Sequence, residues 1–212
     1  MTIAPLDLTK LVPSVLWFLF VIVVVLIFYR PIRDELLPRL SGLNFMGVQF
    51  SFVEASINAA IEVAKKSPQW HVEISPEETE QAVARAKRHV SLFKSASFLW
   101  VDDRPENNLN ERKMFRQLGA EIDTARSSDE ALDMLSRGAY DVVISDMARD
   151  GNATAGLEFL NDFRKINTTT PVIFYIGFVD LDQGVPARAF GITNRPDELL
   201  HLILDALERR KS

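Results

Sequence analysis

The sequence predicts an α/β fold for its C-terminal half, a doubly wound sheet of five parallel strands spanning residues 97–212. Two observations support this prediction. Short apolar runs alternate with amphipathic segments along these residues, as they do in successive βαβ units. Acidic residues, Asp102–Asp103 and Asp146, also follow two of the apolar runs directly, where open parallel sheets place their ligand sites. The N-terminal half lacks this alternation and contains one long apolar run instead.

Five apolar runs support the strand prediction, and four amphipathic segments support the helix prediction. The strands are expected at Phe98–Val101, Glu121–Ala125, Val142–Ser145, Val172–Ile176 and Gly191–Thr193. The helices are expected at Asn108–Leu118, Ser128–Ser136, Gly156–Ile166 and Pro196–Arg210. The segment Val179–Phe190 fits least well, because Gly184 and Pro186 favour a loop or a very short helix. In the flavodoxin-like strand order, strands one and three are neighbours.

A transmembrane helix is predicted at Leu11–Tyr29, a run of 19 residues without a charge. As a helix this run measures roughly 28 Å, close to the thickness of the hydrocarbon core of a bilayer. A cleavable signal peptide is the alternative, but the run is long for one and no small-x-small cleavage site follows it. Residues 1–10 are then a short N-terminal tail.

The charges beside this run predict its orientation. Lys10 precedes it, whereas Arg30, Arg33 and Arg39 follow it. The excess of positive charge on the C-terminal side favours a cytoplasmic C-terminus. We therefore expect a single-pass protein of the inner (cytoplasmic) membrane, with its C-terminal domain in the cytoplasm.

Residues 30–96 are expected to form a small α+β connector with two helices. Pro31 and Pro38 argue against a long continuous helix leaving the membrane. The expected elements before the second helix are one or two short strands in Leu43–Phe52, a helix at Val53–Lys66 and a strand at Trp70–Ile74.

The second connector helix has clear start signals. Ser75 is a suitable N-cap, Pro76 suits the first helical position, and Glu77 and Glu78 suit the positive end of the helix dipole. A narrow apolar stripe follows at Val83, Ala86, Val90 and Phe93. We favour packing of this stripe against the next domain over a coiled-coil homodimer, for which two heptads are too few on their own.

The composition excludes several classes of site. The net charge is −5 and no long Lys/Arg run occurs, which argues against nucleic acid as the main partner. The chain has no cysteine, so disulfides and thiolate sites are excluded. Its three histidines are far apart and lack metal-ligand spacing. A metal site must therefore use oxygen ligands.

The acidic residues at the strand ends suit such a site. If strands one and three are neighbours, Asp102, Asp103 and Asp146 meet in one crevice. Three carboxylates in close proximity disfavour full ionisation unless a cation neutralises them, and Mg²⁺ is a cation that prefers oxygen ligands. With the metal bound, an aspartate can act as a nucleophile toward a phosphoryl group. The alternative is that these acids only cap the helices that follow.

The motifs FLWVDD, VVISDM, PVIFYIG and GITNRP, in this order, resemble the receiver domains of two-component response regulators. The resemblance covers about residues 97–210. It implies that Asp102 and Asp103 bind Mg²⁺, that Asp146 is the phosphoacceptor, and that the backbone carbonyl of Ala148 completes the metal site. It also implies a role in a phosphorelay, with a histidine kinase or another signalling protein as the partner.

Two positions depart from the family pattern. Receivers carry Ser or Thr at the end of the fourth strand, where this chain has Ile176, which lacks the switching hydroxyl. Receivers carry Lys before Pro after the fifth strand, where this chain has Arg195, which keeps the charge but not the compact geometry. The chain thus resembles a degenerate receiver, in which Thr193 or Tyr175 is a speculative substitute for the missing hydroxyl.

Three functions remain open. The first, which we favour over an enzyme, is a membrane-anchored signalling module with output through protein–protein contacts, either phosphorylated at Asp146 or acting as an unphosphorylated pseudo-receiver. The second is a nucleotide-processing or other hydrolase on a flavodoxin-like fold, with candidate groups at Glu106, Asn107, Asn108 and Glu111. The third is use of the same fold for oligomerisation, including a possible homodimer.

Overall fold

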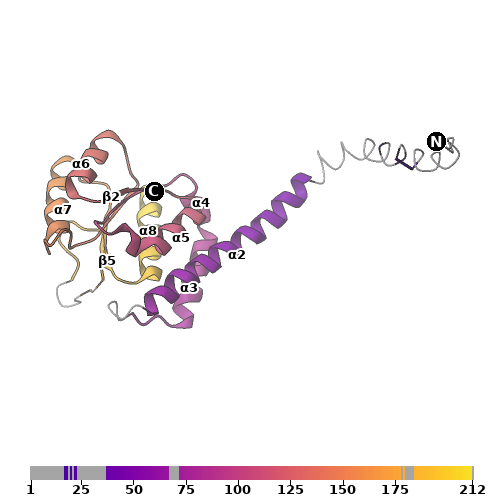
Figure 1. The fold of residues 1–212 in the computed structure, drawn as a ribbon, viewed down its shortest axis with the longest axis horizontal. Helices are drawn as coiled ribbons and strands as arrows, with labels where there is room; N and C mark the ends of the chain where they lie inside the picture. Colours follow the sequence, from indigo (N-terminus) through magenta and orange to yellow (C-terminus); the bar gives the residue numbers. More distant parts are fainter. Residues whose placement is uncertain are drawn as a thin grey trace, which may run out of the picture. The chain divides into compact units, whose positions relative to one another are not determined.

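The computed structural model describes residues 17, 18, 20, 22, 37–66, 72–177, 179 and 184–211 (Figure 1). The chain divides into two compact units, Met1–Gln49 and Phe50–Ser212. The predicted transmembrane segment Leu11–Tyr29 lies almost entirely outside the described residues. Within the described part of the chain, no helix has both the length and the apolar character needed to cross a membrane.

The second unit is built on a five-stranded parallel sheet, as predicted. Its strands are β1 (Ser97–Val101), β2 (Glu121–Ala125), β3 (Val142–Ser145), β4 (Val172–Tyr175) and β5 (Gly191–Thr193). They lie in the order β2-β1-β3-β4-β5, which makes β1 and β3 neighbours. All four pairings are parallel. Apolar residues dominate the three inner strands, because a parallel sheet covered by helices is buried on both faces.

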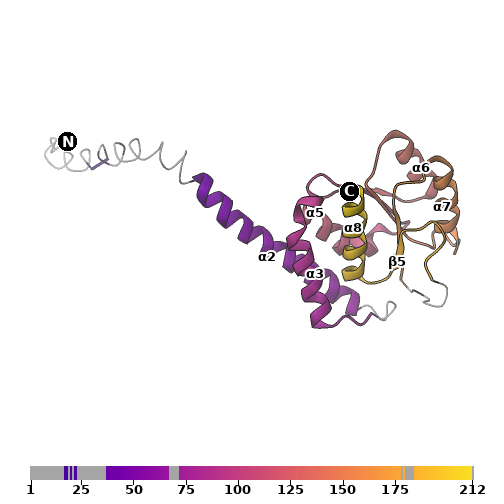
Figure 2. The same ribbon diagram turned by 180° about the vertical axis from the view of Figure 1, so that it is seen from behind.

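Helices cover both faces of this sheet, as Figures 1 and 2 show from opposite directions. The helices are α5 (Leu109–Leu118) and α8 (Pro196–Lys211) on one face and α6 (Ser128–Arg137) and α7 (Ala155–Ile166) on the other. The short 3-10 helix η2 (Pro105–Asn108) leads into α5. The described residues between β4 and β5 form no helix, which agrees with a loop in Val179–Phe190.

Side-chain alternation along the strands divides the core in two. Phe98 and Trp100 of β1 belong to the apolar cluster that includes α5 and α8. Leu99 and Val101 belong to the cluster that includes α6 and α7. The first cluster is the larger one, because it also contains side chains from the segment before the sheet.

That segment differs from the prediction. The residues predicted as strands in Leu43–Phe52 belong to α2, a single helix at Leu37–Lys66. The buried side chains in the second half of this helix recur with helical spacing, at Val53, Ile57, Ala60, Ile61 and Ala64. Once packing holds a helix in place, each further residue adds a hydrogen bond, so the helix extends through a segment of weak strand alternation. Pro38 lies in the first turn of α2, where its missing N–H breaks no helical hydrogen bond.

The strand predicted at Trp70–Ile74 does not form over its described residues either. Val72 and Ile74 are buried in the larger apolar cluster, while Glu73 between them is exposed. The alternation of apolar and polar residues in this segment thus reflects alternating burial against the domain, and the segment is not a strand of the sheet.

α3 (Pro76–Arg88) begins at the predicted residues. The Ser75 hydroxyl accepts a hydrogen bond from the backbone N–H of Glu78 at 3.2 Å. The Glu78 carboxylate accepts one from the Ser75 N–H at 2.7 Å. This capping box satisfies two N–H groups that a helix start leaves unpaired. The helix ends at His89, and the short helix α4 (Val90–Phe93) follows.

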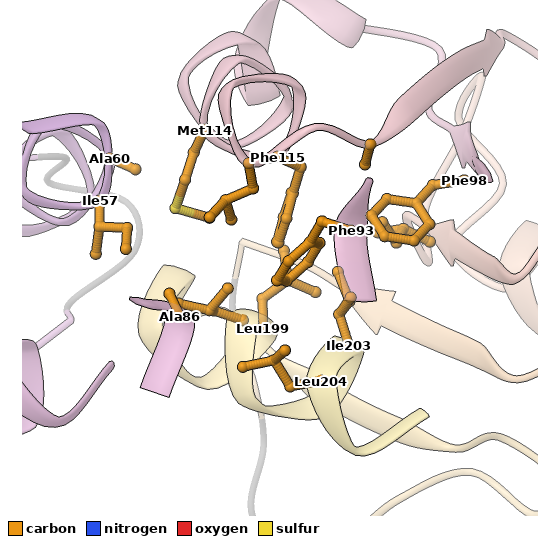
Figure 3. Packing of buried hydrophobic residues seen from close by; sticks show 14 of the residues in the cluster. Ile57, Ala60, Ala86, Phe93, Phe98, Met114, Phe115, Leu199, Ile203 and Leu204 are labelled. Atoms are coloured by element: carbon orange, nitrogen blue, oxygen red, sulfur yellow. The ribbon is translucent and has the colours of Figure 1, made fainter. Parts of the chain in front are cut away.

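The apolar stripe of α3 and α4 faces the core of its own domain, which confirms the packing interpretation. Ala86 and Phe93 are fully buried among residues of α5 and α8 (Figure 3). The Phe93 ring centroid lies 6.4 Å from that of Phe98 and 6.1 Å from that of Phe115. Ile57 and Ala60 of α2 belong to the same cluster. The compact unit that contains the sheet therefore also includes the helical residues from Phe50 onward.

We predict that α2 contributes to stability through its buried face alone. Replacing Ile57, which is 0% exposed, with alanine should lower the free energy of unfolding. The expected loss is about 2–5 kcal/mol, because the change removes buried methyl groups and leaves a cavity. Val63→Ala, on the same helix at a 48% exposed position, is the control and should change it by about 0.5 kcal/mol or less. Urea denaturation measures both; equal effects would show that α2 is not part of the core.

Candidate functional site

Three carboxylates meet at the carboxyl ends of β1 and β3. The register pairs Val101 with Ser145, the last residues of the two strands. The backbone N–H of Asp146 donates to the Val101 carbonyl at 2.9 Å, which fixes Asp146 beside the end of β1. One oxygen each of Asp102, Asp103 and Asp146 lies within 4.8 Å of the others. The structure thus brings together the three acidic residues that the sequence placed at neighbouring strand ends.

Hydrogen bonds orient each carboxylate. One Asp102 oxygen accepts from the Arg104 N–H at 2.7 Å and the other accepts from the Asn108 side-chain amide. Asp103 Oδ2 accepts from the Asp150 N–H at 3.0 Å. Asp146 Oδ1 accepts from the Met147 N–H at 2.7 Å. Asp146 Oδ2 and Asp103 Oδ1 make no hydrogen bond to the described residues and are available to a ligand.

The electrostatics of the cluster favour a cation. Burial, and next the charge of Asp102, raise the pKa of Asp146 to about 6. Burial also raises the pKa of Asp102, which is 4% exposed, and the charge of Asp103 adds to this effect. Both shifts mean that the negative charges are poorly compensated within the protein.

A divalent cation would supply the positive charge that these carboxylates lack. Asp103 and Asp146 each keep one carboxylate oxygen free of hydrogen bonds to the described residues, and the cluster found among those residues consists of carboxylates alone, the oxygen donors that Mg²⁺ prefers. The residues present therefore fit Mg²⁺. Ala148, whose carbonyl is the predicted fourth protein ligand, lies exposed in the loop after β3; its role as a ligand stays a prediction.

Arg149 is part of the site that the sequence did not reveal. It is 3% exposed, and its guanidinium donates to the Ser145 hydroxyl at 2.8 Å and to the backbone carbonyl of Asp146. It also donates to the Ser128 hydroxyl at 2.9 Å and the Ala155 carbonyl at 3.0 Å, at the starts of α6 and α7. Its charge lowers the pKa of Asp146 and opposes the effect of burial. An arginine after a strand usually lies at the surface, so no sequence signal identified this one.

Arg195, the predicted counterpart of the receiver lysine, has other partners. Its guanidinium donates to Asp197 at 2.6 Å and to Glu78 at 2.7 Å. The bond to Asp197, and then the bond to Glu78, raise the pKa of Arg195. The Ser75 N–H, and next the Arg195 guanidinium, lower the pKa of Glu78 to about 2. Glu78 belongs to the capping box of α3, so Arg195 ties the loop after β5 to the helix before the sheet. Its described ion pairs include none of the three clustered aspartates.

Ile176 directly follows β4, and its role as the switch position stays a prediction. Ile176 is half-buried in the apolar cluster beside α7, and its N–H donates to the Thr193 carbonyl at 3.0 Å. The two speculative substitutes face other groups. The Thr193 hydroxyl donates to Glu198 at 2.6 Å, and the Tyr175 hydroxyl donates to Glu111 at 3.0 Å. Neither of these two hydrogen bonds involves the acidic cluster.

The four groups considered for a hydrolase do not converge. Glu106 and Asn107 are exposed in η2. Asn108 is buried and supports Asp102. Glu111 is 1% exposed and lies against Tyr175 of β4, in the core layer under α5. Only Asn108 contacts the acidic cluster in the described structure.

Comparisons with known proteins match the same part of the chain. Residues 98–194 match the family model described as response regulator receiver domain, which is just under half of the chain. The sensor protein EvgS of Escherichia coli K12 is 30% identical over 101 residues, which are 48% of this chain but only 8% of that protein. A receiver domain protein from Clostridium thermocellum is 30% identical, with 55% of this chain and 97% of that chain covered and a TM-score of 0.48. TrrA from Thermotoga maritima, solved with Mg²⁺ and BeF, is 28% identical, with 52% and 98% covered and a TM-score of 0.45.

Glu111 should make the stability of the domain depend on pH. Burial raises its pKa from an ordinary 4.5 to about 7. The folded chain then holds a proton on Glu111 that the unfolded chain has released, so stability falls as pH rises from 4.5 to 7 and levels off above it. Glu111→Gln should lack this contribution to the fall. The free energy of unfolding of the variant, relative to that of the parent, should therefore rise by about 2 kcal/mol from pH 5 to pH 8.

Chemical denaturation across this pH range measures the difference. Glu106 is an exposed carboxylate on the preceding turn, and Glu106→Gln is the matched control. The difference between its free energy of unfolding and that of the parent should be the same at every pH. If the difference between Glu111→Gln and the parent is also the same at every pH, the raised pKa of the buried Glu111 carboxyl is contradicted.

Proposed function

We propose that the response regulator receiver domain formed by residues 98–194 accepts a phosphoryl group on Asp146 in a phosphorelay. The observation that carries the proposal is the cluster of Asp102, Asp103 and Asp146 at adjacent strand ends. Asp102 and Asp103 would hold Mg²⁺ together with Asp146 and the Ala148 carbonyl. Bound Mg²⁺ would neutralise charge on the carboxylates and on the oxygens of the incoming phosphoryl group.

The residues of the chain define how the transfer proceeds. Asp146 Oδ1 is held by the Met147 N–H, which leaves Oδ2 to attack phosphorus. For a phosphohistidine donor, the P–N bond breaks and its electron pair returns to the imidazole nitrogen, while the new P–O bond forms on Asp146. Because its pKa is about 6, Asp146 is mostly ionised at neutral pH and can serve as the nucleophile.

The partner that fits this chemistry is a histidine kinase or another phosphohistidine protein. The similarity to one segment of a sensor protein supports a partner of this class. Ile176 has no hydroxyl to bond the phosphoryl group, so we infer that output passes through protein–protein contacts rather than through a hydroxyl switch. The Arg195–Glu78 ion pair, which joins the site's side of the domain to α3, is a route for such output.

We further propose that the domain is tethered to the cytoplasmic membrane through Leu11–Tyr29. The length of this uncharged run and the arginines after it support the tether and a cytoplasmic position of the domain.

Phosphorylation should depend on Asp146 and on Mg²⁺. Incubation of the full chain with acetyl phosphate should give a phosphoprotein band on a phosphate-affinity gel, absent without Mg²⁺ and absent in Asp146→Asn. Asp150→Asn is the matched control: it lies in the same loop at a positive φ of 49°, which asparagine tolerates, and it should be labelled normally.

Two outcomes would count against this site. Equal labelling of Asp146→Asn and the parent would place the phosphoryl group elsewhere. No labelling of the parent, by acetyl phosphate or by a histidine kinase, would leave a pseudo-receiver that acts only as a docking domain.

Deletion of residues 1–36 should move the protein from the membrane fraction to the soluble fraction of a cell lysate, because it removes the apolar run. A matched deletion of residues 1–10 alone should leave it in the membrane fraction. Identical fractionation of the two variants would contradict the tether. Immunoblotting after ultracentrifugation makes the comparison.

A further inference from the structure

A second candidate site lies at the opposite edge of the sheet from the acidic cluster. Here a cavity of about 720 Å³ opens beside the amino ends of β3, β4 and β5, where Asp141, Pro171 and Phe190 precede the strands. Its walls come from four segments: the end of α6 with the loop after it, the end of α7 with the loop after it, the turn before β5, and the last turns of α8. The last turns of α8 end near the C-terminus marked in Figure 1.

The cavity is positively charged in a chain whose net charge is −5. Four arginines line it, Arg164, Arg188, Arg209 and Arg210, and Asp141 is the single acidic residue among its lining residues. Asp141 is already used, because it forms an ion pair with Arg210 and accepts the Ser97 N–H at 2.7 Å. Three of the four guanidinium groups therefore have no carboxylate partner in the described structure.

Arg164 is the most costly of these charges. It is 7% exposed, and within the described part of the chain its guanidinium donates to the backbone carbonyls of Arg188, Asn167 and Thr170 at 2.9 to 3.2 Å. It also lies 5.6 Å from the centre of the Phe163 ring. Burial, and next the charge of Arg188, lower its pKa. Its hydrogen bonds to carbonyls satisfy these donors but supply no opposite charge, so an anion bound in the cavity would lower the electrostatic cost of burying this cation beside a like charge.

Arg188, which lines the cavity beside Arg164, has a strained backbone conformation. Its φ is 69°, in the left-handed region that residues other than glycine rarely adopt. This conformation directs the Arg188 carbonyl onto both Nε and the terminal nitrogen of Arg164, at 3.1 and 3.0 Å. Strained residues of this kind concentrate at ligand sites, where the surrounding contacts hold them.

Aromatic surface accompanies the charges. The Arg209 guanidinium lies 5.0 Å above the centre of the Phe190 ring, and the half-buried Tyr140 lines the wall contributed by the loop after α6. The Tyr140 hydroxyl donates to Asp123 at 2.8 Å, which fixes the ring. Guanidinium groups that converge from different segments are suited to bind phosphate oxygens, and flat surfaces are suited to bind a planar ring.

We propose that this cavity binds a small phosphorylated molecule with at least two negative charges. Its volume is in the range of sites for nucleotide-sized ligands. The phosphates would lie against the exposed guanidinium groups of Arg188 and Arg209, beside the buried charge of Arg164, and a base or other ring would lie against Tyr140. This site is separate from the phosphoacceptor site and does not require Mg²⁺.

Calorimetric titration of the full chain with ADP and, separately, with inorganic pyrophosphate tests the proposal. EDTA is present throughout, so that no metal can recruit either probe to the acidic cluster. We expect saturable binding that weakens as salt rises, because the contacts are ionic. Arg188→Gln and Arg209→Gln should each weaken it by about tenfold or more, because each removes a charge-assisted bond. Lys165→Gln, next to Arg164 but outside the cavity and paired with Asp162, should bind like the parent.

The two probes separate the possible sources of the anion. Tighter binding of ADP than of pyrophosphate indicates a nucleotide, whereas equal binding indicates an inorganic anion; both support the site. No binding of either probe overturns the proposal. So does binding that neither arginine variant weakens, provided that thermal melting shows both variants to be folded. Either failure leaves the phosphorylation of Asp146 untouched, because that reaction is assayed with Mg²⁺ and acetyl phosphate.

Discussion

The parallel pairing of β1 with β3 is the constraint on which the rest of this domain depends. It puts two buried strands side by side inside the sheet, and it sets the register that pairs Val101 with Ser145, the last residues of the two strands. The next residues along both strands are acidic, so the pairing brings like charges together. Hydrophobic burial of the strands holds these carboxylates in place despite their repulsion, and burial, together with the charge of Asp102, raises the pKa of Asp146.

The helices before the sheet are an integral part of the domain. α2, α3 and α4 cover α5 and α8 with a continuous apolar cluster, in which Phe93 contacts both Phe98 and Phe115. The segment is therefore a layer of the domain and not a linker. Through Glu78, the same layer holds Arg195 in the loop after β5. Arg195, the predicted counterpart of the receiver lysine, thus links the loop after β5 to the helices before the sheet.

The two edges of the sheet carry opposite charge. The carboxyl edge has three clustered aspartates, and the amino edge has a cavity with four arginines and one aspartate. Both clusters are incompletely neutralised by protein groups, and both contain a residue that burial makes costly, Asp102 at one edge and Arg164 at the other. A cation at the first edge and a phosphorylated anion at the second would each relieve a cost that folding imposes.

Local signals in the sequence are sufficient to predict the sheet and most of the acidic site. The alternating apolar runs and the caps are local signals, so the strands, the start of α3 at Ser75 and the convergence of Asp102, Asp103 and Asp146 could all be predicted. Only the tertiary structure decided the rest. Leu43–Phe52 became helical because packing of residues such as Ile57 holds α2 as one unit. Arg149 became buried, and Arg195 turned to Glu78, 117 positions away. These outcomes depend on which distant groups meet when the core closes, and local periodicity carries no information about that.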